Sequence, residues 1–178
     1  IAGLLLFAVG TIPMADADVN TAFIAIVIYG IINRLGISLT QPFIITVSLR
    51  TLPPEKLNSG AGTMNFIRQL GGSLGINAWV VFLEMRTHYH AETLAATQSS
   101  GNDASRELLS SVGQLLGETG VSEAVQQSGA LHYLGQVVHA QGATLGFQDG
   151  FWVLVAAYLI GIWPAWMLGR RAKNKDWQ

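Results

Sequence analysis

The feature that most constrains this chain is a series of apolar runs longer than ordinary core helices need. Phe151–Leu168 holds no charged residue, and residues 21–49 meet an amide or charged side chain only at Asn33, Arg34 and Gln41. A helix needs about 20 mostly apolar residues to cross a hydrocarbon core about 30 Å thick. Backbone groups in lipid must be paired within the protein, so such runs are expected to be helical. The sequence therefore predicts an all-α membrane protein.

The predicted organisation follows the order of these runs. Transmembrane helices are expected over 1–86, with a partial span at 1–13 and full spans at 21–49 and 61–86. They are followed by an extracytoplasmic segment at 87–146, a last span at 147–169 and a cytoplasmic tail at 170–178. Pro13 is expected to end the partial span. Pro53 and Pro54 are expected to keep the loop after the second run from being helical, because proline lacks the N–H that a helix uses.

The segment 87–146 carries two amphipathic patterns. Apolar residues recur at three- to four-residue spacing, first at Leu108, Leu109, Val112, Leu115 and Leu116, then at Ala130, Leu131, Leu134, Val137 and Val138. This spacing is typical of helices with one apolar face. Gly101 and Asn102 mark a break before the first helix, and Gly117 and Gly120 mark its end. We expect an amphipathic helical hairpin outside the hydrocarbon, before the last span.

Composition and spacing exclude several classes of function. Charged residues make up 12% of the chain, the net charge is −1 and the mean hydropathy is +0.38, so nucleic acid is not an expected partner. The absence of cysteine excludes disulfides, thiolate metal sites and cysteine nucleophiles. His88 and His90 are two residues apart and point to different faces of a helix, and no carboxylate completes a set with His132 and His139. No nucleotide-binding motif is present. We therefore expect no enzyme, no metal and no cofactor.

The distribution of basic residues predicts the orientation in the membrane. Six lie on one side of the spans, at Arg50, Lys56, Arg170, Arg171, Lys173 and Lys175. The opposite side has only Arg86 and Arg106 in its long segment. Lysine and arginine concentrate in cytoplasmic loops, so the Pro-Pro loop and the C-terminus are expected to be cytoplasmic.

Arg34 lies near the middle of the 21–49 run, where an arginine costs roughly 2.5 kcal/mol or more to insert. Gly30, Arg34, Ser38, Gln41 and Ser48 form a stripe at helical spacing, broken by Ile45. The stripe is either the face of a transport pathway, with Arg34 contacting substrate or a proton-carrying carboxylate, or a structural face on which Arg34 bonds backbone carbonyls of a neighbouring helix. The sequence leaves both open.

The third run contains the string Gly60-Ala-Gly-Thr-Met-Asn-Phe-Ile-Arg-Gln-Leu-Gly-Gly-Ser-Leu-Gly75. Gly71, Gly72 and Gly75 are expected to let another helix approach closely, since a Gly-x-x-x-Gly spacing places small residues on one face. Asn65, Arg68 and Gly72 share a face, with Gln69 beside them. This face is either a packing surface with an interfacial arginine or part of a gate or substrate path.

Extended on its N-terminal side to Leu52-Pro-Pro-Glu-Lys-Leu-Asn-Ser, this string resembles the penultimate helix of fourteen-span transporters in the major facilitator superfamily. The branch is the drug:proton antiporter-2 family, of the EmrB/QacA type. Arg34-Leu-Gly36 with Pro42 resembles the family's Arg-Gly-x-Gly…Pro helix, with Leu35 where the family often has glycine. Residues 138–151 resemble its entry into the last helix.

The resemblance implies the C-terminal part of a multidrug or small-molecule efflux transporter that works by alternating access and proton-coupled antiport. Its partners would be the N-terminal half of the same polypeptide, the lipid bilayer, a hydrophobic small-molecule substrate, protons and a periplasmic adaptor protein. Its location would be the bacterial inner membrane, as a multi-pass protein. Because the chain begins at Ile1 inside an apolar run, we expect a fragment. The residues expected to line the substrate cavity are Arg34, Ser38, Gln41, Asn65 and Gln69.

A second hypothesis comes from a different class of protein. The chain would be a non-transporting membrane interaction or scaffold subunit, whose outer helical hairpin binds a partner. The exposed amphipathic segment at 87–146 motivates this alternative.

Overall fold

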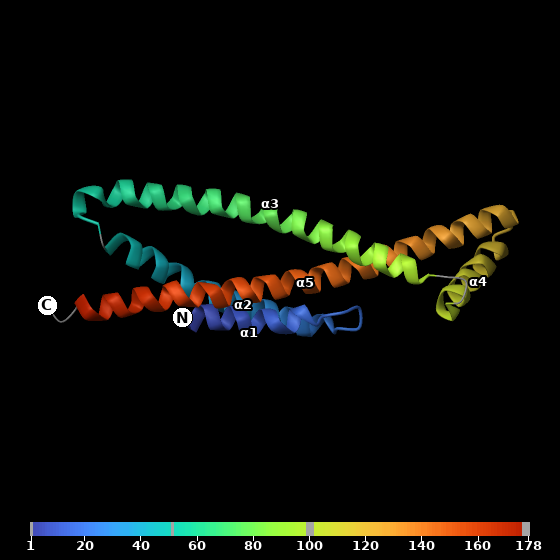
Figure 1. Cartoon of the computed structure of the whole chain (residues 1–178), viewed down its shortest axis with the longest axis horizontal. Helices are drawn as coiled ribbons and strands as arrows, with labels where there is room; N and C mark the ends of the chain where they lie inside the picture. Colours follow the sequence, from blue (N-terminus) through green and yellow to red (C-terminus); the bar gives the residue numbers. More distant parts are fainter. Residues whose placement is uncertain (1, 51, 99–101, 176–178) are drawn as a thin grey trace. The chain divides into compact units, whose positions relative to one another are not determined.

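The computed structural model describes residues 2–50, 52–98 and 102–175, with side chains as far as Met167. Its helices are α1 (Ala2–Ala15), α2 (Phe23–Arg50), the 3₁₀ turn η1 (Pro54–Lys56), α3 (Leu57–Thr97), α4 (Asp103–Glu118) and α5 (Glu123–Lys175) (Figure 1). Within these described ranges every regular element is helical, as the apolar runs predicted.

Three helical segments are long and apolar enough to cross a membrane, judged by length and composition. They are Phe23–Arg50, Pro54–Thr97 and Glu123–Met167, with mean hydropathies of 1.8, 1.2 and 1.6 over their most apolar stretches. Within those stretches only 6%, 0% and 11% of the residues are buried. Water does not tolerate such continuous apolar surface, whereas lipid does. The described residues therefore fit an all-α membrane protein.

α1 packs against α2 through small residues. A Cβ atom added to Gly36 would lie 2.9 Å from the carbonyl oxygen of Gly3, so the two backbones are in contact there. The buried Thr11 hydroxyl donates to the Phe7 carbonyl at 2.7 Å and lies 3.4 Å from Oδ1 of Asn33. Close backbone approach and a polar contact between helices are the usual means by which helices associate in lipid.

The chain divides into two compact units. The first contains residues 1–80 and 148–178, and the second contains Val81–Phe147. In the first unit α5 also contacts α1 and the loop that follows it. The Gln148 amide donates to the Ala17 carbonyl at 2.9 Å, and the rings of Phe7 and Tyr158 stack at 4.7 Å. The two contacts run in opposite order along the chain, so these stretches of α1 and α5 are antiparallel.

In the second unit the end of α3 crosses α5 at two glycines. A Cβ on Gly142 would lie 2.9 Å from the Ala91 nitrogen, and one on Gly146 would lie 3.0 Å from the Thr87 nitrogen. Both glycines are buried. The pairing of Gly142 with Ala91 and of Gly146 with Thr87 brings two small-x-x-x-small faces together, with the helices antiparallel.

The turns show how the helices begin and end. Pro53 is extended and caps η1, Pro54 occupies its first position, and α3 begins directly at Leu57. Asn102 caps α4, because its side chain accepts from the Ser105 N–H. Gly120 has a φ of 78°, the left-handed conformation that glycine adopts without strain, and it lies in the turn between α4 and α5. Gly101 lies outside the described residues.

Two proline expectations were wrong in detail. The Pro-Pro pair begins a helical turn, since proline is favoured at the first helical position, where no N–H is needed. α1 continues through Pro13 to Ala15, and a proline inside a membrane helix is tolerated where neighbouring groups satisfy the freed backbone carbonyl.

The helix bounds also differ from the spans expected at 61–86 and 147–169. α3 is 41 residues long and runs to Thr97, and α5 is 53 residues long and joins the second amphipathic pattern to the last apolar run without a break. Where the membrane begins and ends along these helices stays a prediction.

The crossing at Gly142 predicts opposite effects for two substitutions in α5. Gly142→Ala is expected to lower the free energy of unfolding by about 1–3 kcal/mol, because its Cβ meets the Ala91 backbone. Gly135→Ala is expected to raise it by up to about 1 kcal/mol, since that position is open and alanine favours helix. Thermal unfolding of the full chain in detergent measures both. Equal shifts for the two variants would contradict the crossing.

Candidate functional site

The polar stripe of α2 lies on a face that does not contact α1. Gly36 and Asn33 face α1, whereas Arg34, Ser38 and Gln41 are exposed. At 100° per residue, these three side chains fall within about 60° of one another around the helix. The helix therefore has one face packed against α1 and a separate polar face available to another element or to water.

Ser38 is partly used inside its own helix. Its hydroxyl donates to the Arg34 carbonyl at 3.0 Å, the ordinary bond of a serine to the preceding turn. The hydroxyl oxygen can still accept one further bond. Ser38 can therefore take part in a polar site as an acceptor, while its proton is held by the backbone.

On α3, Asn65 and Arg68 form a pair. The Arg68 guanidinium donates to Oδ1 of Asn65 at 2.8 Å, and both side chains are exposed. Gln69 is exposed next to them. The bond satisfies part of the arginine charge within one turn of the same helix. Asn65 thus supports Arg68 in this structure.

The five predicted cavity residues are all exposed and are divided between two helices. On α2 the Ser38 hydroxyl donates to the backbone carbonyl of Arg34, and on α3 the Arg68 guanidinium donates to Asn65. Among the described residues, no hydrogen bond links the α2 set to the α3 set. A substrate cavity lined by Arg34, Ser38, Gln41, Asn65 and Gln69 stays a prediction.

The predicted packing glycines of α3 are also open. Nothing lies within 4 Å of a Cβ placed on Gly71, Gly72 or Gly75, in contrast to Gly36, Gly142 and Gly146. Within the described residues, then, the packing face of α3 has no helix against it. Its use as a packing face stays a prediction.

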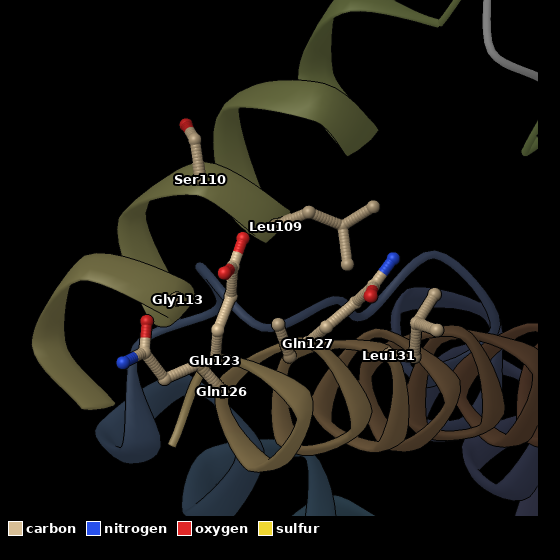
Figure 2. A pocket seen from close by; sticks show the side chains of 8 residues that line it. Leu109, Ser110, Gly113, Glu123, Gln126, Gln127 and Leu131 are labelled. Carbon is tan, nitrogen blue, oxygen red and sulfur yellow. The ribbon is translucent and has the colours of Figure 1, made fainter. Parts of the chain in front are cut away.

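A separate groove of about 410 Å³ lies between α4 and the start of α5. In Figure 2, Leu109 of α4 extends over Gln127 and Leu131 of α5, with Glu123 and Gln126 nearer the turn. The full lining is Leu109, Ser110, Gly113, Glu123, Gln126, Gln127, Ala130 and Leu131. One carboxylate at the first turn of α5 is the ordinary companion of a helix N-terminus. The groove therefore has no charge pattern that identifies a ligand.

Only some of the apolar residues in the two amphipathic patterns are buried by helix packing. Ala130 and Val138 are buried, at 2% and 8% exposure, whereas Leu115 and Leu131 are more than half exposed. The Gly142-x-x-x-Gly146 spacing, which carries the crossing with α3, was visible in the sequence but was not singled out. Within the described residues, no three histidine, aspartate or glutamate side chains are grouped to hold a metal ion.

The polar turn between α1 and α2 is held by Asp18. Its carboxylate accepts from the Asn20 N–H at 3.0 Å, the Asn20 amide at 3.2 Å and the Thr21 hydroxyl at 3.0 Å. The side-chain bonds from Asn20 and then Thr21, which favour the ionised form, lower the pKa of Asp18. Asp18 therefore acts as a turn residue here.

Comparison with known proteins gives distant matches to transporters. The chain is 26% identical over 149 residues to the multidrug export protein EmrB of Haemophilus influenzae, covering 82% of this chain and 28% of that protein. It is 26% identical to EmrB of Escherichia coli K12, over 68% of the chain and 22% of the relative. It is also 26% identical to the uncharacterized MFS-type transporter YhcA of Bacillus subtilis, over 57% of the chain and 19% of the relative.

No family profile and no solved structure matches the chain. The chain spans about a quarter of the length of the curated relatives it matches. The long apolar helices fit a multi-pass membrane protein, and the distant similarity is to proteins named as transporters. The relatives are named as transporters, a class that is not enzymatic in general.

The open glycines of α3 predict a difference between two contexts. In the 178-residue chain, Gly75→Leu is expected to cause no steric overlap and therefore no loss of unfolding free energy from overlap, because the space around Gly75 is open. In a longer polypeptide that adds a helix against this face, the same change is expected to cost about 1–3 kcal/mol, because the leucine side chain would overlap that helix. Thermal unfolding of both proteins in detergent measures the difference. An equal effect in the two proteins would exclude a neighbour at Gly75.

Proposed function

We propose that this chain supplies the C-terminal helices of a multidrug or small-molecule efflux transporter of the major facilitator superfamily, in its drug:proton antiporter-2 branch. The observation that carries the proposal is the distant similarity to EmrB over most of the chain. In this proposal the chain is a fragment of a longer polypeptide, and the N-terminal half of that polypeptide completes the transport path. Transport is by alternating access, coupled to protons.

The polar face of α2 supports the proposal. Arg34 and Gln41 are exposed on one face of α2, while another face packs on α1. Polar side chains at membrane depth are costly, so a helix with a purely structural role is not expected to carry them on a face turned to lipid. A substrate path through the membrane needs such a face, with polar groups at mid-depth between apolar walls. Arg34, Ser38 and Gln41, joined by Asn65 and Gln69 of α3, are the proposed lining.

The basic residues support a defined orientation. With Arg50 and Lys56 on the cytoplasmic side, the segment 87–146 lies outside the bacterial inner membrane and the C-terminus lies inside. In this arrangement α4 and the first turns of α5 form an extracytoplasmic amphipathic hairpin. Its exposed surface is then the place where a periplasmic adaptor protein would bind.

Replacing Arg34 tests the role of the α2 face. In the full-length parent protein, Arg34→Ala is expected to reduce substrate efflux about tenfold, the cost of losing a hydrogen bond to a charged group. Leu39→Ala is the matched control, since Leu39 is an exposed apolar residue on another face of α2. Dye accumulation in cells lacking other exporters measures the effect. Unchanged export and substrate range in Arg34→Ala would remove Arg34 from the pathway.

Cysteine labelling tests the orientation. The 178 residues contain no cysteine, so single cysteines introduced in this part of the protein can be labelled individually. With a membrane-impermeant maleimide, Ser122→Cys is expected to be labelled in intact spheroplasts. Glu55→Cys is expected to be labelled only after permeabilisation. The reverse pattern would place the segment 87–146 in the cytoplasm and would contradict the proposed hairpin location.

A further inference from the structure

Arg34 is a permanent positive charge deep in an apolar helix. It lies within three residues of the midpoint of the 28-residue helix α2, or about 4 Å from the centre at 1.5 Å per residue. A guanidinium does not lose its proton in proteins, so the charge cannot be removed by a pKa shift. Charged groups at this depth are normally paired or face a water-filled cavity.

The sequence contains no acidic residue at that depth. Aspartate and glutamate are absent from residues 19–54, 57–83 and 150–175, which include the apolar parts of α2, α3 and α5. The acidic residues nearest to α2 along the chain are Asp18 before it and Glu55 after it. Glu55 lies in the turn η1, and the Asp18 carboxylate is occupied by Asn20 and Thr21. Neither can neutralise a charge at the centre of the helix.

The neighbouring turns of α2 provide no side-chain carbonyl either. The positions three and four residues from Arg34 hold Gly30, Ile31, Ile37 and Ser38, and the Ser38 hydroxyl already donates to a backbone carbonyl. Arg68 is the informative contrast, because Asn65 supplies an acceptor at 2.8 Å one turn away. The sequence thus places an acceptor one turn from the arginine of α3 and none one turn from the arginine of α2.

We infer that Arg34 binds a carboxylate or a similar organic anion near the middle of the membrane. The inference rests on the proposed transport function, and it adds the chemical class of the ligand. Arg34 would make the charged contact, and Gln41, on the same face about two turns away, would donate to a polar group further along the ligand. The anion can come from an ionised amphipathic substrate or from an acidic side chain of another span of the same polypeptide.

Transport of three matched probes separates these two sources. The probes are 4-butylbenzoate, its neutral methyl ester and the N-butylpyridinium cation, and the protein is the full-length parent with Arg34→Gln or Arg34→Lys. If the substrate supplies the anion, Arg34→Gln lowers uptake of butylbenzoate into everted vesicles about tenfold or more, while the other two probes are unaffected. Arg34→Lys then recovers part of the benzoate transport, because it keeps the charge but loses the bidentate geometry.

If a protein carboxylate supplies the anion, the result is different. Arg34→Gln then lowers transport of every exported probe and shifts its pH dependence, because the carboxylate loses the charge that held its pKa down. A second substitution that neutralises the acidic residue then restores transport in the Arg34→Gln background. Wild-type rates and pH dependence for all exported probes in Arg34→Gln would overturn the inference.

A measurement without transport keeps the inference testable if the parent exports none of these probes. If the substrate supplies the anion, Arg34→Cys in a cysteine-free full-length background is expected to react with a membrane-impermeant sulfonate thiosulfonate reagent, because a soluble anion must be able to reach this position. Leu39→Cys is the control and is expected to be unreactive in lipid. In wild-type protein, 4-butylbenzoate is expected to raise the unfolding temperature, and Arg34→Gln is expected to remove that shift.

These outcomes distinguish the failure of the two proposals. An inert Arg34→Cys, together with equal benzoate stabilisation in wild type and Arg34→Gln, excludes a substrate anion at this position. The anion site is overturned, even if efflux is found, when Arg34→Gln also leaves the transport rates and their pH dependence unchanged. A reactive Arg34→Cys with arginine-dependent benzoate binding in a protein that moves nothing retains the anion site and rejects the transport function.

Discussion

The structure depends on its helices being surrounded by something other than water. Few residues in the most apolar stretches of α2, α3 and α5 are buried within the chain, so burial there cannot be the main source of their stability. A helix closes its own backbone hydrogen bonds, which is the requirement that lipid imposes on any spanning segment. In that solvent the apolar side chains need no internal core, and the informative contacts become the few places where backbones touch or polar groups meet.

Those contacts are built from small residues. Gly3 with Gly36, and Gly142 with Ala91, bring pairs of helices to backbone contact, where the packing of backbone and small side chains replaces the hydrophobic effect. Gly71, Gly72 and Gly75 of α3 are small residues of the same kind, but within the described residues no helix packs against them. Glycine in a helix costs about 1 kcal/mol of helix stability relative to alanine. Close packing against a further helix would offset that cost for these three glycines, whereas an open stretch does not.

The sequence was sufficient for the existence of the long helices and for the approximate bounds of α2. Twenty or more apolar residues, with lipid requiring internal hydrogen bonds, leave little choice of structure, and α2 begins and ends within two residues of the predicted run. The sequence was less informative about continuity. The segment 87–146 and the last span at 147–169 were predicted as separate elements, whereas α5 joins them, and Gly142 and Gly146 are close-packing positions at the crossing with α3.

The candidate site was predictable only as a list of residues. Helical spacing places Arg34, Ser38 and Gln41 on one face without any structure. What that face meets depends on other segments, and spacing within one helix has no information about them. The bond from Ser38 to its own backbone and the pair of Arg68 with Asn65 were also hidden, because both depend on rotamers and not on periodicity.

Pro42 has a consequence for the same face. A proline inside α2 has no N–H, so the backbone carbonyl four residues earlier, that of Ser38, loses its regular helical donor. That carbonyl is a strong acceptor in a region where acceptors are costly to leave unpaired. The polar face of α2 thus combines a fixed cation at Arg34 with a backbone oxygen, one turn further on, that lacks the donor of a regular helix.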